Sequence, residues 1–186
     1  MTKVWACALI LVAAQAQADP LVMETLAADL DKDGRKELAV LVGESDISLA
    51  IFGQTEDYGP MRLVAEGPGL AWMGSLNEPP RMEITEAGSL RVTSSNWGIG
   101  RNKWEMDVIV AWRSGAFRVA GIRFVEVDTL ELESGRSCDV NLLTGRGILT
   151  SNREDAPDIA VRAVIGAVPI EDWPENGIAQ ACGPDW

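Results

Sequence analysis

The chain has 186 residues, 47% of them hydrophobic, which is enough for one compact domain with a core. Its 28 acidic residues exceed its 16 basic ones, and the formal net charge of -12 argues against nucleic acid and anionic membrane surfaces as partners. The sequence contains no histidine, which excludes Ser-His-Asp and Cys-His catalysis and histidine-ligated zinc.

Residues 1–18 have the features of a secretory signal peptide. A lysine is followed by the apolar run Val4 to Ala14, and Ala16-Gln17-Ala18 provides a small-x-small cleavage site. The apolar run is too short for a membrane span, which needs about 20 residues. We therefore predict export to the periplasm or secretion, a single β domain over residues 19–186, and no membrane span after cleavage.

Most of the chain alternates apolar and polar residues at period two, with turn residues about every 8 to 12 positions, which predicts an antiparallel β domain. The clearest strand runs from Trp104 to Trp112, and Arg113 to Ala116 is typical of a hairpin turn. The alternation shifts phase near Gly121, which predicts a β-bulge there. We expect a mostly β protein, either an antiparallel β-sandwich or a partly open barrel. Later elements are predicted as a strand over Ser137 to Leu143, a buried strand or short helix over Ile159 to Val168, and one helical turn over Gly177 to Cys182.

Signal cleavage removes Cys7 and leaves Cys138 and Cys182. Two cysteines in an exported chain predict one internal disulfide, the alternatives being free thiols or pairing between chains. The bond would close a loop of about 45 residues, worth roughly 4 kcal/mol in the chain-entropy description.

The stretch 29–37 places acidic residues at alternate positions around a glycine. Calcium takes six to eight oxygen ligands, and alternating carboxylates on a tight loop can converge on one ion while the glycine permits the turn. An EF-hand loop needs a glutamate at position 12, and counted from Asp29 that position is Val40, so an EF-hand is excluded. The alternative is a solvated acidic turn. The predicted calcium ligands are Asp29, Asp31, Asp33, the backbone carbonyl of Arg35, and Glu37.

This loop, followed by the apolar stretch Leu38 to Gly43, resembles the calcium loops of FG-GAP repeats (integrin α-chain-like, VCBS-type). In that family the motif supports a β-propeller of several repeats. Here it occurs once, and no second acidic loop follows at a period of about 40 to 50 residues, so the sequence does not favour a full propeller. The stretches Asn96 to Phe124 and Ser137 to Gly147 are similar to small exported proteobacterial proteins, a likeness that implies export and a single β domain but no activity.

A second candidate site is the loop around Trp97, which carries Arg101 and Asn102 close by. An indole face beside polar groups can bind a sugar or a peptide, and the alternative is that Trp97 packs into the core beneath its loop.

These observations predict an exported, calcium-stabilised, non-enzymatic binding or interaction module whose partner is a protein or a glycan. No catalytic residue is singled out. The alternatives are a carbohydrate-active hydrolase that uses paired carboxylates, and a secreted inhibitor of another enzyme.

Overall fold

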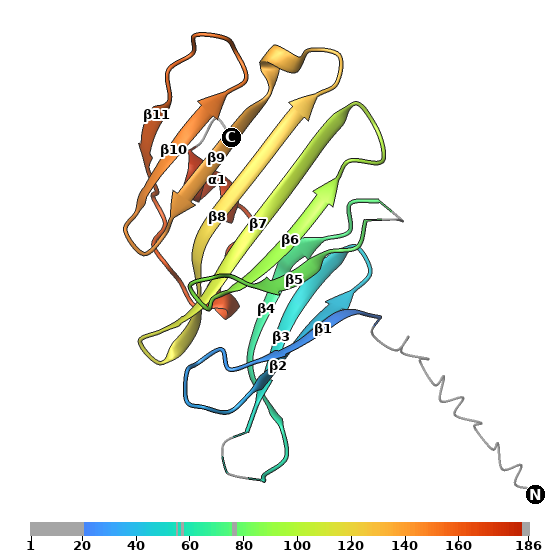
Figure 1. Ribbon diagram of the computed structural model, residues 1–186, viewed down its shortest axis with the longest axis vertical. Coiled ribbons are helices and arrows are strands. Elements are labelled where there is room, and N and C mark those ends of the chain that lie inside the picture. The colour runs from blue at the N-terminus through green and yellow to red at the C-terminus, as the bar shows by residue number, and fades with distance from the viewer. Residues whose placement is uncertain (1–20, 55, 57, 76–77, 184–186) are drawn as a thin grey trace, which may run out of the picture.

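The computed structural model describes residues 21–54, 56, 58–75 and 78–183 (Figure 1). The predicted signal peptide lies outside the described residues. Two antiparallel sheets account for the domain, and in each sheet every strand pairs with its neighbours in the sequence.

The smaller sheet has four strands in chain order. They are β1 (Val22–Ala28), β2 (Glu37–Gly43), β3 (Asp46–Gly53) and β4 (Arg62–Trp72).

The larger sheet has seven strands, also in chain order. They are β5 (Arg81–Ile84), β6 (Leu90–Asn96), β7 (Asn102–Arg113), β8 (Ala116–Asp128), β9 (Arg136–Asn141), β10 (Arg146–Ser151) and β11 (Ile159–Arg162).

Apolar side chains from both sheets form one shared core. Leu41, Leu49 and Ile51 are fully buried on the smaller sheet, and Val92 and Val119 are fully buried on the larger one. Two facing antiparallel sheets, neither of them closed, make a β-sandwich, which is one of the two architectures that the sequence predicted.

The central hairpin and the bulge were both predicted correctly. Ser114 and Gly115 have φ values of 53° and 77° and form a tight turn between β7 and β8. Further along, Ile109 pairs with Gly121 while Val110 pairs with Val119, so that one extra residue interrupts β8 beside Gly121.

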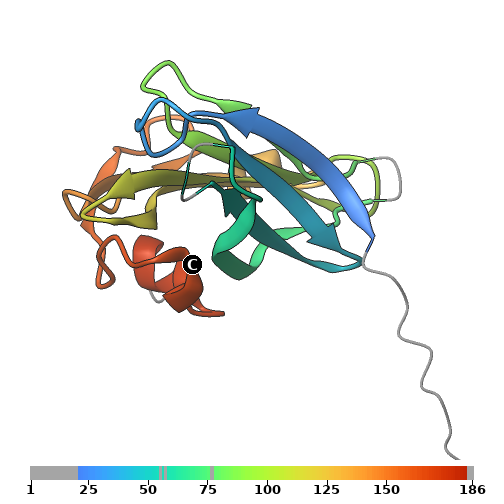
Figure 2. The same cartoon turned by 90° about the horizontal axis from the view of Figure 1, so that it is seen from below.

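The C-terminal segment contains the short helices η2 (Ile170–Asp172) and α1 (Gly177–Cys182), and a further short helix, η1 (Leu132–Ser134), precedes β9. This segment packs on β8, β9 and β11 of the larger sheet, and it also contacts β4 of the smaller sheet (Figure 2). A disulfide joins Cys138 on β9 to Cys182 on α1, with the Cα atoms 5.9 Å apart, as predicted.

The expectation of a buried element over Ile159 to Val168 was wrong. Only Ile159–Arg162 form a strand, β11, which is the edge of the larger sheet and has one neighbour. Ile159 is 58% exposed and Val164 is 83% exposed. An apolar stretch is buried only where another element covers it, and much of the sheet edge at β11 faces solvent.

Within the part of the chain that the structure describes, no helix is both long and apolar enough to cross a membrane.

Candidate functional site

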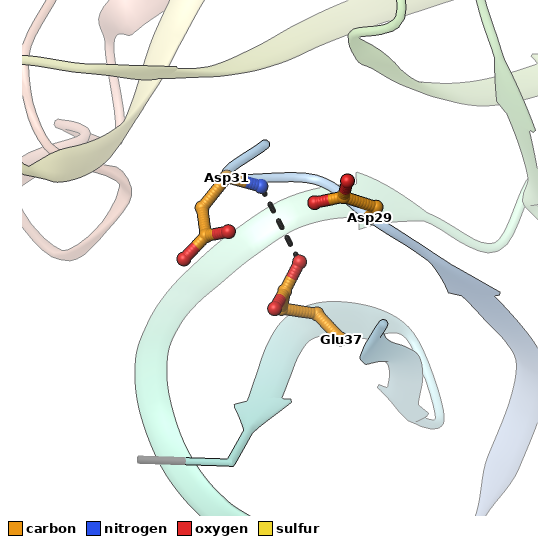
Figure 3. Close-up of side chains that lie close together, drawn as sticks. All are labelled: Asp29, Asp31 and Glu37. Atoms are coloured by element: carbon orange, nitrogen blue, oxygen red, sulfur yellow. Dashed lines mark hydrogen bonds between the residues drawn. The ribbon is translucent and has the colours of Figure 1, made fainter. Parts of the chain in front are cut away.

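The acidic loop joins β1 to β2 and brings three carboxylates together. One oxygen each from Asp29, Asp31 and Glu37 lies within 4.8 Å of the other two. Figure 3 shows these three side chains close together. Lys32 and Gly34 have φ values of 68° and 91°, so the loop turns sharply in the left-handed region at the predicted glycine and also two residues before it.

Glu37 is the most buried member of this cluster, with 4% of its surface exposed. It begins β2 and points to the same inward face as Ala39 and Leu41 because side chains alternate along a strand. Its Oε2 accepts hydrogen bonds from the backbone N–H of Leu30 at 2.7 Å and of Asp31 at 3.3 Å. Burial raises the pKa of this carboxyl group, and the two N–H donors act in the opposite direction.

Asp29 contributes an oxygen atom that the protein leaves unsatisfied. Its Oδ2 accepts a hydrogen bond from the N–H of Gly34 at 3.3 Å. Its Oδ1 is buried and has no hydrogen-bond partner among the described residues. A buried polar atom without a partner is costly, and a bound cation would satisfy it.

Asp33 was also predicted as a ligand, but its carboxylate does not belong to the cluster of Asp29, Asp31 and Glu37. The ligand predicted from Arg35 is its backbone carbonyl, which stays a prediction. The Asp33 carboxylate accepts a hydrogen bond from the N–H of Arg35 at 2.8 Å and pairs with the Arg35 guanidinium. The backbone hydrogen bond from Arg35 is the main reason why the pKa of Asp33 is lowered, and the guanidinium adds to the effect. The ammonium group of Lys32 donates to the backbone carbonyl of Asp29, at 2.9 Å, and leaves the carboxylates free of a lysine partner there.

The loop around Trp97 is organised differently from what its residues suggested. Trp97 is 45% exposed, so it is not a core residue, and its backbone N–H donates to Glu78 Oε2 at 2.7 Å. Arg101 forms ion pairs with Asp128 at 2.5 Å and with Glu131 at 3.3 Å. Asn102 is the first residue of β7 and is exposed. Because the Arg101 charge is already balanced by the protein, this loop offers a weaker binding site than its sequence implied.

A cavity of about 390 Å³ opens beside the acidic loop, at the end of the sandwich where the β1–β2 loop and the β7–β8 turn lie close together (Figure 1). Asp31, Glu37, Trp112 and, on η2, Glu171 are among the residues that line it. Sequence reasoning did not identify Trp112 or Glu171 with this site, because no local pattern relates η2 or the end of β7 to residues 29–37.

The outer face of the larger sheet carries a second hollow, of about 470 Å³. Its lining includes Asp107, Arg123 and Asp139, which lie side by side on β7, β8 and β9. Asp107 is 8% exposed and accepts a hydrogen bond from the Thr93 hydroxyl at 2.6 Å. Its other oxygen is 3.7 Å from Arg123, so this buried carboxylate is balanced by its own neighbours.

Comparison of the chain with protein-family models, with curated proteins and with solved structures finds no match in any of the three. The side chains described above are therefore the basis on which a function is inferred.

Proposed function

We propose that the protein is an exported, calcium-stabilised, non-enzymatic interaction module. The observation that supports this proposal best is the unsatisfied Oδ1 of Asp29, buried beside two further carboxylates whose ligand oxygens lie within 4.8 Å of one another. Three carboxylates this close repel one another in the absence of a counter-ion, and hard oxygen donors are the ligands that calcium prefers.

The donor set fits calcium in number and kind if the loop backbone and water complete it. Asp29, Asp31 and Glu37 would supply one or two oxygens each, and calcium takes six to eight. Glu37 is held by two backbone N–H groups, so its position is fixed before an ion arrives. The ion would tie the start of β2 to the end of β1, and we infer that its role is to stabilise this end of the sandwich.

Calcium-dependent unfolding tests the proposal directly. We expect saturating calcium to raise the unfolding temperature relative to excess chelator, because a ligand at 100 times its Kd adds about 2.7 kcal/mol of stability. Asp31→Asn should abolish the shift. Asp46→Asn, which removes one exposed carboxylate at the far end of β2 and β3, is the matched control and should retain the shift. A protein whose unfolding temperature is the same in calcium and in chelator would contradict the calcium site.

Export is part of the same proposal, and the Cys138–Cys182 disulfide supports it, because such bonds persist in oxidising compartments. Mass spectrometry of the protein recovered from the periplasm of a bacterial host should show a chain that begins at Asp19. Recovery of the full-length chain from the cytoplasm alone would contradict export.

The hydrolase alternative is less well supported than the interaction module. A glycosidase needs one carboxyl group that keeps its proton beside another that stays ionised. Glu37 has a raised pKa, but the two N–H groups that donate hydrogen bonds to it favour its ionised form. An ionised carboxylate suits a metal ligand better than a general acid. The inhibitor alternative would use the exposed Trp97, whose loop is held to Glu78 by two backbone hydrogen bonds.

A further inference from the structure

The cavity at the end of the sandwich lies between the inward faces of the two sheets. Glu37, Gly53 and Ala65 line it from the smaller sheet. Trp112 and Phe117 line it from the larger sheet, on the face that also carries Val108 and Val110. An inward position in a sandwich normally takes an apolar side chain, yet here the inward residue at the start of β2 is a glutamate.

Only one of the two carboxylate oxygens of Glu37 accepts hydrogen bonds from other described residues. Its Oε2 accepts both hydrogen bonds from Leu30 and Asp31, and its Oε1 accepts none from any other described residue. The side chain is 96% buried, since 4% is exposed, and it lines the cavity. A carboxylate with so little exposed surface and one oxygen that faces no protein donor can accept a hydrogen bond from a positively charged group in the cavity.

The charged residues that line the cavity also favour a positively charged occupant, because most of them are acidic. Asp31 and Glu37 contribute two carboxylates from the acidic stretch 29–37, and Glu171 contributes a third from η2. The remaining charged lining residues, Asp33 and Arg35, form an ion pair with each other. The described lining therefore carries an excess of negative charge that no lining lysine balances.

Two aromatic side chains also line the site. The ring centroids of Trp112 and Phe117 are 4.8 Å apart, at an interplanar angle of 59°, and Phe117 is buried. Tryptophan is the best side-chain partner for a cation over an aromatic ring, especially where water is excluded.

We propose that this cavity binds the ammonium group of a lysine side chain on a partner protein. An ammonium group is a compact point charge with three donors on a flexible apolar stem, whereas a guanidinium is a planar fork that matches paired carboxylate oxygens. The single open oxygen of Glu37 suits the compact group. The apolar stem can pack along Val64 and Ala65, which line the same cavity from β4.

Lysine and calcium would share Asp31 and Glu37. Calcium should therefore weaken lysine binding, and this one consequence rests on the proposed calcium site. Binding of lysine to the calcium-free protein does not depend on it.

Calorimetric titration of the purified, oxidised protein in excess chelator tests the proposal, with Nα-acetyl-lysine methylamide as the probe. We expect saturable binding at millimolar concentrations, and none for the same compound acetylated at Nε, which has lost its charge. Glu171→Gln should weaken binding roughly two- to fivefold, the range of one partly exposed ion pair. Asp172→Asn is the matched control, because it removes an exposed acidic neighbour on η2 that does not line the cavity, and it should leave affinity unchanged.

Nuclear magnetic resonance adds a readout at the aromatic side chains. The indole N–H signal of Trp112, assigned by Trp112→Phe, should shift during the titration. Absence of saturable binding in chelator, equal binding of the acetylated probe, or equal effects of Glu171→Gln and Asp172→Asn would overturn the proposal. If lysine binds in chelator but calcium does not compete, the calcium site is contradicted and the lysine site stands.

Discussion

Thr93 on β6 and Asp107 on β7 face each other across the outer surface of the larger sheet, and the Thr93 hydroxyl donates a 2.6 Å hydrogen bond to the Asp107 carboxylate. Asp107 is 8% exposed, so this bond replaces solvation that the carboxylate has lost. We predict that Thr93→Val lowers the free energy of unfolding by about 1.5–3 kcal/mol, the range for a hydrogen bond to a charged group. Urea denaturation measures the change. Thr93→Ser retains the hydroxyl and should recover most of the stability; equal loss in both variants would contradict a role for the bond.

The disulfide between Cys138 and Cys182 spans a sequence separation of 44 residues. Because it restricts the unfolded chain, we predict that replacing both cysteines by alanine lowers the free energy of unfolding by roughly 2–5 kcal/mol. Chemical denaturation of the double variant and of the reduced native protein should give similar midpoints, both well below that of the oxidised protein. A midpoint unchanged by reduction would show that the bond adds no stability.

Gly74 lies against the backbone of Ser95, so that a Cβ at position 74 would be 1.5 Å from the Ser95 carbonyl oxygen. The backbone cannot accommodate this without moving, and overpacking typically costs about 1–3 kcal/mol, occasionally more. We predict that Gly74→Ala is strongly destabilising in thermal unfolding. Gly166→Ala is the matched control, since nothing lies within 4 Å of a Cβ at position 166. Similar unfolding temperatures for the two variants would contradict the close approach.

Asp128 gives a prediction of pH dependence. The side-chain hydrogen bond from Arg101 is the main cause of its lowered pKa, and the N–H of Leu130 adds to the effect. A carboxyl group with a lowered pKa stabilises the folded protein above its unfolded pKa, near 3.8, and this contribution is lost as the pH falls through the lower folded value.

Arg101→Gln should therefore return the Asp128 pKa toward 3.8 and flatten this part of the acid limb of the stability curve. Carboxyl-carbon nuclear magnetic resonance titration of Asp128 in both proteins measures the pKa. An Asp128 pKa that is the same with and without Arg101 would contradict the pairing.

Local patterns were sufficient to predict the fold class, the β7–β8 hairpin and the disulfide. Ser114 and Gly115 adopt the positive φ angles that a tight hairpin turn needs, and turn residues there are visible in the sequence. The two cysteines of the predicted mature chain had one internal pairing available, and Cys138 and Cys182 form it.

The sequence could not show which face of β2 points inward. Leu38 and Val40 form an apolar set on one face, but the structure leaves them half-buried and buries Glu37, Ala39 and Leu41 on the other. Both sets of side chains alternate at the same period, so the packing of β2 against the larger sheet determines which set is buried. The same inward choice places Glu37 beside the cavity, and the approach of Glu171 to that cavity depends on contacts far apart in the chain.

The strict succession of strands in both sheets has a consequence for the order of folding. Since each described strand pairs only with its neighbours in sequence, hairpins can form one after another as the chain is synthesised. Cys182 follows the eleven strands of the described chain, so its bond to Cys138 can form only after the segments of all these strands have been synthesised. The disulfide therefore attaches the last helix to a sheet whose strands have had time to pair.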